Sequence, residues 1–178
     1  SFEVLLLREQ APRGPDVSEL VLPGEAARSY VARVTQEKAD TAYRVMQQRR
    51  LPTHPVLAAD TTVVLDGQIL GKPADVHEAR AMLTALAGRS HIVLSAIALH
   101  TANFSKHLIQ ESTVHFCAMS QEQIAAYCAS DEPYDKAGGY GIQGLAARYI
   151  SHINGQYSGI MGLPLFETCQ LLEEAGVA

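Results

Sequence analysis

VLAADTTVVLDGQIL, residues 56–70, is the stretch of this sequence that decides its fold. Its first ten residues are rich in β-branched side chains, which favour a strand. The run stops at Asp66-Gly67, and Asp-Gly between two apolar runs is the strongest short signal for a β-hairpin. We therefore predict strands over residues 56–65 and 68–70, joined by a two-residue turn.

One charged residue, Asp60, interrupts the first of these strands. A carboxylate inside an apolar strand costs free energy unless it is paired with a cation or hydrogen-bonded. Two interpretations stay open on this ground alone. Asp60 is either a functional carboxylate or a strand-end residue whose oxygens are satisfied by backbone amides.

The register of the predicted hairpin gives Asp60 a cationic neighbour. If Leu65 pairs with Gln68, counting outward brings Lys72 opposite Thr61, one step from Asp60. Ideal pleating would place the ammonium and the carboxylate on opposite faces, so they converge only if the strand ends splay apart. The alternative for Lys72 is a solvated lysine at the sheet edge.

The segments on either side of the hairpin alternate between helices and strands. Apolar residues at three- and four-residue steps predict helices, of which the first carries Lys38. The pairs Asp75 with Glu78 and Ser120 with Gln123 mark helix starts. The order of elements predicts an α/β protein with a mixed sheet. The predicted helices cover residues 25–50, 75–88, 120–129 and 165–175, and the predicted strands cover residues 2–7, 90–100, 108–117 and a second hairpin, 148–153 with 156–161, around Asn154-Gly155.

Composition excludes several classes of protein. A length of 178 residues fits one domain with a sizeable core. A net charge of −5 without a dense block of Lys and Arg argues against a nucleic-acid partner, although a small anionic ligand needs only a few cations. No apolar run reaches the roughly 18 residues of a membrane span. Since no secretion leader opens the sequence either, we expect a cytoplasmic protein without a membrane partner.

The polar, glycine-rich segment 131–144 is predicted to be a loop. Gly139, Gly141 and Gly144 match the glycine pattern of dinucleotide-binding folds. That pattern must follow an apolar strand and open a helix, whereas a polar stretch precedes it here, so we reject a nicotinamide cofactor. The plain alternative is a flexible loop. We prefer a loop whose amides and Gln143 side chain approach a ligand.

Nine short strings of this sequence resemble those of the Maf proteins, nucleoside triphosphate pyrophosphatases also named for inhibition of septum formation. Each string is weak alone, but together they follow the family order along almost the whole chain. They are QEKA (36–39), AADT (58–61), LDG (65–67), GKP (71–73), LAGRSH (86–91), DKAG (135–138), YGIQG (140–144), ING (153–155) and GLP (162–164).

The resemblance implies a fold and a substrate class. The implied fold is similar to that of the inosine triphosphatases: one Maf-like domain over residues 1–178, in which an elongated mixed sheet forms two lobes around a cleft, usually as a homodimer. Thr61 and the GIQG string look like the branch that hydrolyses dTTP and UTP, modified pyrimidine nucleotides included, rather than the branch that acts on 7-methyl-GTP. By analogy, Thr61 and Gln143 help to choose the base.

The resemblance also implies roles for charged residues. Asp60 orients or deprotonates the attacking water, Glu19 and Asp60 hold Mg²⁺ or Mn²⁺, and Lys38 and Lys72 neutralise phosphate oxygens. A rival interpretation is a non-catalytic nucleotide-binding regulator of cell division. Turnover separates the two, because a pure binding protein would show saturable affinity without release of pyrophosphate.

The sequence departs from the family pattern near its beginning. The family's Ser-x-Ser-Pro-Arg-Arg segment, which binds phosphates, has no counterpart, since Pro12-Arg13 is not equivalent. The family's Asp-Ile-Asp-Glu string stands here as DVSE at residues 16–19, which keeps Glu19 and loses one Asp. Either the chain is a fragment or the enzyme is impaired. We favour a fragment, because the opening Ser-Phe-Glu matches the family's first loop and second strand.

Overall fold

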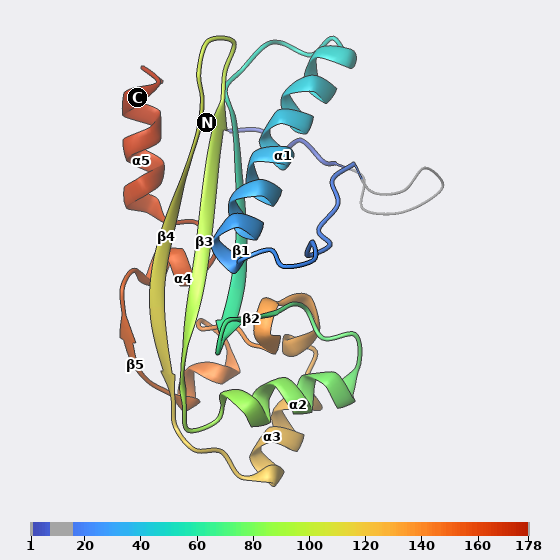
Figure 1. Cartoon of the computed structure of the whole chain (residues 1–178), viewed down its shortest axis with the longest axis vertical. Helices are drawn as coiled ribbons and strands as arrows, with labels where there is room; N and C mark the ends of the chain where they lie inside the picture. Colours follow the sequence, from blue (N-terminus) through green and yellow to red (C-terminus); the bar gives the residue numbers. More distant parts are fainter. Residues whose placement is uncertain (1, 8–15, 178) are drawn as a thin grey trace. The chain divides into compact units, whose positions relative to one another are not determined.

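The structure is a computed structural model that describes residues 2–7 and 16–177. It is an α/β protein with a five-stranded antiparallel sheet in the order β2-β1-β3-β4-β5 and flanking helices, which confirms the expected fold class (Figure 1). The chain divides into two compact units. Unit 1 comprises residues 1–60, 96–109 and 165–178, and unit 2 comprises residues 61–95 and 110–164. A cleft between two lobes stays a prediction.

The long hairpin of the sequence is present as predicted. Strand β1 (Val56–Leu65) pairs with β2 (Gln68–Leu70) in antiparallel fashion, with Leu65 opposite Gln68. Asp66 and Gly67 both have positive φ angles, 50° and 79°, which is the requirement of a type I′ turn. The turn therefore sets the register that the sequence predicted.

Unit 1 is built around one long helix. Helix α1 (Ala27–Gln48) lies against strands β3 (Ser90–His100) and β4 (Ser105–Phe116), because Asp40 accepts a hydrogen bond from His100 at 2.6 Å and Gln36 bonds Ser105. Leu171 of helix α5 (Leu165–Glu174) packs with buried residues of β3. The helix that carries Lys38 is thus fixed to the sheet by polar contacts.

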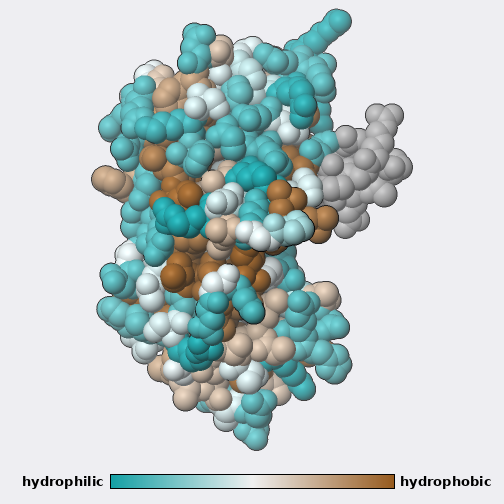
Figure 2. Space-filling view, in the orientation of Figure 1, coloured by the Kyte–Doolittle hydropathy of each residue, from teal (hydrophilic) through white to brown (hydrophobic). Residues whose placement is uncertain are grey.

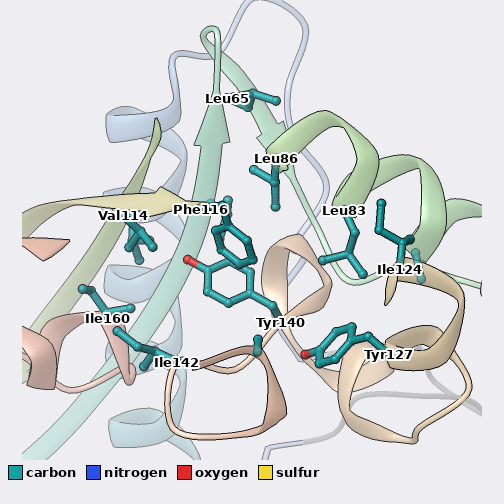
Figure 3. Packing of buried hydrophobic residues seen from close by; sticks show 14 of the residues in the cluster. Leu65, Leu83, Leu86, Val114, Phe116, Ile124, Tyr127, Tyr140, Ile142 and Ile160 are labelled. Atoms are coloured by element: carbon teal, nitrogen blue, oxygen red, sulfur yellow. The ribbon is translucent and has the colours of Figure 1, made fainter. Parts of the chain in front are cut away.

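Unit 2 holds the larger core, which Figure 3 shows at close range. Helices α2 (Val76–Leu86) and α3 (Gln121–Cys128) contribute Leu83 and Ile124, and Phe116 and Tyr140 meet edge to face at 4.9 Å between ring centroids. Both helix caps are as predicted, with a full capping box at α3. The remaining elements are the short helices η1 (Glu132–Asp135), η2 (Ala137–Gly139), η3 (Leu145–Tyr149) and α4 (Tyr157–Ile160) and strand β5 (Ile150–Asn154).

Two predicted strands are wrong. Residues 2–7 form no strand, and Phe2, Val4 and Leu6 expose most of their side chains, because no strand in the described part of the chain pairs with them. Residues 156–161 were predicted as the second arm of a hairpin, but Tyr157–Ile160 form helix α4 instead. The N–H of Gln156 donates to the Ser112 hydroxyl and the helix begins directly after it, so the backbone turns away from β5.

The surface and the thiols agree with the composition. Hydrophobic residues interrupt a mostly hydrophilic surface (Figure 2), and the exposed apolar side chains include Leu145 and Phe166. Among residues 2–7 and 16–177, no helix is long and apolar enough to cross a membrane. Cys117, Cys128 and Cys169 are free thiols.

Candidate active site

The candidate active site in unit 1 is a lysine held between two carboxylates. The Lys38 ammonium lies 2.7 Å from Asp60 Oδ1 and 2.7 Å from Glu19 Oε1. Lys38 comes from α1, Asp60 from β1, and Glu19 from the segment that precedes α1. Asp60 exposes 16% of its side chain and Glu19 52%, so the cluster opens to solvent on the Glu19 side. The structure brings together three of the six residues that the sequence singled out.

The two carboxylates decide the charge of this cluster. Burial alone would lower the pKa of Lys38, but the charges and hydrogen bonds of Asp60 and Glu19 outweigh it and raise that pKa, so Lys38 stays an ammonium at neutral pH. Burial, and then the charges of Asp60 and Glu19, raise the pKa of Tyr30, whose hydroxyl donates to the Glu19 carbonyl. The site therefore combines fixed negative charge with one positive charge.

Arg33 fixes the segment that carries Glu19. Its guanidinium donates to the carbonyls of Ser18 at 3.5 Å and Leu20 at 3.0 Å, which flank Glu19 in the chain. Glu25 holds the guanidinium through two hydrogen bonds of 2.7 and 2.8 Å. Because Leu20 and its neighbours expose their side chains, apolar packing contributes little to the position of Glu19. The polar contacts of Arg33 therefore hold the Glu19 segment in position.

The arrangement of Glu19 and Asp60 fits a divalent cation. Both carboxylates contact one nitrogen, so the oxygens that contact it lie no more than twice 2.7 Å apart. Mg²⁺ binds oxygens at about 2.0–2.1 Å and usually takes one or two carboxylates, with substrate phosphates and water as the other ligands. In the described part of the chain no group of three or more His, Cys, Asp or Glu residues gathers as a metal site. A two-carboxylate site is therefore the one that these residues support.

Thr61 follows Asp60 in β1 and belongs to unit 2. Its hydroxyl is the first donor in a series of two side-chain hydrogen bonds. Thr61 Oγ1 lies 2.7 Å from Ser95 Oγ, and Ser95 Oγ donates to the Gly159 carbonyl at 2.6 Å. Since the single Ser95 proton goes to that carbonyl, Thr61 is the donor to Ser95. The oxygen of Thr61 is then left to act as an acceptor.

Lys72 and Gln143 also belong to unit 2. Lys72 comes just after β2, and the Gly138 N–H donates to the Gly71 carbonyl at 2.9 Å. The pKa of Asp135 is lowered by its hydrogen bond to Lys136, and the charge of Lys72 contributes to that shift. The Gln143 side chain is exposed. That Lys72 and Gln143 meet a ligand stays a prediction, and so does the proximity of Lys72 to Asp60.

Sequence reasoning missed a buried polar pair in unit 2. His91 is 3% exposed, and its Nε2 lies 2.6 Å from the Tyr140 hydroxyl, whereas its Nδ1 has no hydrogen-bond partner among the described residues. Burial, with a smaller contribution from the charge of His115, lowers the pKa of His91 to about 4. A protonated ring would leave a buried Nδ1–H donor without an acceptor. The pair therefore holds Tyr140 with a neutral imidazole.

His91 predicts a pH dependence of stability. Its pKa is lower in the folded chain than the ordinary histidine value of 6.5, so the unfolded chain binds more protons below pH 6.5, and stability falls as pH drops from 6.5 towards 4. Between pH 7 and pH 5 we expect the free energy of unfolding to decrease by about 1–2 kcal/mol more in the parent protein than in His91→Gln. Urea unfolding at both pH values measures this. An equal decrease in both proteins contradicts it, and the exposed His107→Gln is the control.

Two carboxylates suited to a divalent cation, beside a fixed lysine on an α/β scaffold, are typical of enzymes of metal-assisted phosphoryl transfer. The chain belongs to the Maf-like proteins, because the family model described as Maf-like protein matches residues 5–175. Curated relatives extend the match over nearly the whole chain.

Three of these relatives are each named dTTP/UTP pyrophosphatase. The protein of Nitrosomonas europaea is 51% identical over 175 residues, which cover 98% of this chain and 84% of that protein. That of Nitrosospira multiformis is 49% identical, with 99% and 85% coverage. That of Albidiferax ferrireducens is 51% identical, with 96% and 86% coverage.

Proposed function

We propose that this chain is a pyrophosphatase that hydrolyses dTTP and UTP to the monophosphate and pyrophosphate. The observation that carries the proposal is Lys38 held between Asp60 and Glu19 at 2.7 Å each, since these are the groups that a triphosphate and its cation require. Relatives of about 50% identity with that activity in their names support the substrate class.

Asp60 is the proposed base. Its carboxylate orients the attacking water and takes its proton while the water oxygen bonds to phosphorus and the bond to the bridging oxygen breaks. Lys38 holds Asp60 ionised and positioned and, with Lys72, neutralises phosphate oxygens. Glu19 and Asp60 would hold Mg²⁺ or Mn²⁺, which supplies positive charge to the leaving pyrophosphate.

Thr61 and Gln143 are the proposed base-recognition residues. The hydroxyl of Thr61 gives its proton to Ser95, so Thr61 offers an acceptor. The N3–H of thymine and uracil is a donor, which such an acceptor suits. Gln143 offers both a donor and an acceptor from an exposed position in the loop.

The remaining features of the proposal concern the protein as a whole. We propose one Maf-like domain over residues 1–178, a homodimer, a cytoplasmic location and no nucleic-acid or membrane partner. The net charge of −5 without a dense basic block supports the last point. Light scattering on the purified protein tests the dimer, which a monomeric mass would contradict.

The function is tested by product analysis. The protein is mixed with dTTP or UTP and Mg²⁺, and the products are separated by anion-exchange chromatography. We expect monophosphate and pyrophosphate in equal amounts. If the products are instead nucleoside diphosphate and inorganic phosphate, the enzyme cuts the β–γ anhydride, which contradicts the proposal. Saturable nucleotide binding without turnover would favour the alternative, a non-catalytic regulator of cell division.

A further inference from the structure

The loop that carries Gln143 is tied to one carboxylate. Glu132, at the start of η1, accepts hydrogen bonds from the N–H of Leu145 at 2.7 Å and of Ala146 at 3.3 Å. Its carboxylate also accepts a bond from the Tyr127 hydroxyl at 2.7 Å. Gln143 thus lies close in the chain to two amides held by a single side chain.

The charge of Glu132 is built into this turn. Burial alone would raise the pKa of Glu132, but the N–H of Leu145, the Tyr127 hydroxyl and the amides of Ala146 and Gly141 lower it. The amides of Gly141 and Leu145 lie on opposite sides of Gln143 in the sequence. An ionised carboxylate therefore holds the end of the turn that follows Gln143, and charge-assisted hydrogen bonds of this kind are stronger than neutral ones.

Gly144 is explained by the same carboxylate. A Cβ atom at Gly144 would overlap the Glu132 carboxyl group, and a Cβ at Gly141 would come within 3.0 Å of Lys136 Cε. The Lys136 ammonium in turn donates to the Glu132 carbonyl at 3.3 Å. Gly144, the last glycine of the pattern that resembles a dinucleotide motif, is thus required for the backbone to close around Glu132.

Tyr127 anchors Glu132 to the core. Its side chain is 4% exposed and belongs to the core cluster of unit 2, where Figure 3 shows it on α3. Ile142, next to Gln143, is buried in the same cluster at 7% exposure. The backbone at Gln143 is therefore held on one side by the buried Ile142 and on the other by the amides bound to Glu132.

We propose that Glu132 is a positioning residue for base selection, which aims the Gln143 amide at the base of a pyrimidine nucleotide by holding the backbone of residues 141–146. This inference rests on the proposed function, because it assigns a ligand to Gln143. The Glu132 carboxylate contacts the backbone amides of Leu145 and Ala146 and the Tyr127 hydroxyl, so it acts on the loop. Its loss changes which base is accepted more than how fast the anhydride is cut.

The test compares Glu132→Gln with the parent protein on dTTP, UTP, dCTP and dGTP. Glutamine keeps the shape but replaces one acceptor oxygen with an NH₂ donor that faces the amides. We expect KM for dTTP to rise at least about fivefold, kcat to stay within about threefold, and the preference for dTTP over the other bases to fall at least about fivefold. Glu122→Gln, an exposed glutamate of α3, is the matched control and should match the parent protein.

Two further variants keep the inference testable if Glu132→Gln does not fold. Tyr127→Phe removes one hydrogen bond to Glu132. It should lower the preference for dTTP as well, by a smaller factor than Glu132→Gln does. Gly144→Ala should lower the preference for dTTP when it is made in the parent protein. The same change made in Glu132→Ser should have a much smaller effect, because serine has no carboxyl group for the new Cβ to overlap. If Glu132→Gln folds and its base preference is unchanged, the inference is overturned while the function stands. If Glu132→Gln does not fold, an unchanged base preference in Tyr127→Phe has the same consequence. A parent protein that cuts none of the four nucleotides overturns both.

Discussion

Asp60→Asn is expected to lower kcat/KM for dTTP at least about a thousandfold, the loss typical of a removed general base that is also a metal ligand. Asparagine keeps the size of the side chain but cannot take a proton from water. It also removes the negative charge that faces the Lys38 ammonium at 2.7 Å. Initial rates of pyrophosphate release over a range of dTTP and Mg²⁺ concentrations measure the loss.

The control for this variant is Asp66→Asn. Asp66 lies at the turn that ends the same strand and pairs with Arg89, but its side chain is 69% exposed and it has no part in the proposed site. Its rate should equal that of the parent protein. A folded Asp60→Asn that retains more than about a tenth of the parent kcat/KM would remove Asp60 from the role of base.

The parts of the fold that the sequence predicted correctly are those whose causes are local. The Asp66-Gly67 turn sets its own φ angles, and with them the pairing of Leu65 with Gln68. The capping box of Ser120 and Gln123 closes within four residues. Such features need no information from distant parts of the chain, so their patterns predict them well.

The predictions that failed depend on distant partners. Residues 2–7 are a mostly apolar run of the kind found in strands, but a strand forms only when a neighbour supplies its hydrogen bonds, and in the described residues none does. Asn154-Gly155 looks like a hairpin turn. The N–H of Gln156, however, donates to the hydroxyl of Ser112 in β4, which is distant in the sequence. The tertiary contact outweighs the local signal.

The candidate site shows the same division. Asp60 was identifiable from the sequence because a carboxylate in an apolar strand is anomalous, and Lys38 followed from its matched family string. No local pattern indicated that Arg33 would fix the Glu19 segment, or that Glu132 would hold the loop of Gln143, because each contact joins residues 13 positions apart that no short motif connects. Positioning residues are therefore harder to predict than the residues they position.

Lys38→Met is expected to separate the two roles of Lys38. Without the ammonium, the negative charges of Asp60 and Glu19 lie close together and repel each other. Repulsion of this kind lowers the stability of the folded chain. We therefore expect the metal-free variant to have a lower Tm than the parent protein at pH 8.

A divalent cation should reverse this loss. In the parent protein the cation competes with the Lys38 ammonium for the two carboxylates, whereas in Lys38→Met that competition is gone, so Mn²⁺ should bind more tightly and raise Tm by more. Turnover of dTTP should nevertheless fall about a hundredfold, because one charge that faces the phosphates is gone. Lys106→Met, which breaks an exposed pair with Glu174 in the same unit, should change none of these quantities. If Mn²⁺ raises Tm equally in Lys38→Met and the parent protein, the ammonium does not compete with the cation, and the two carboxylates are not its ligands.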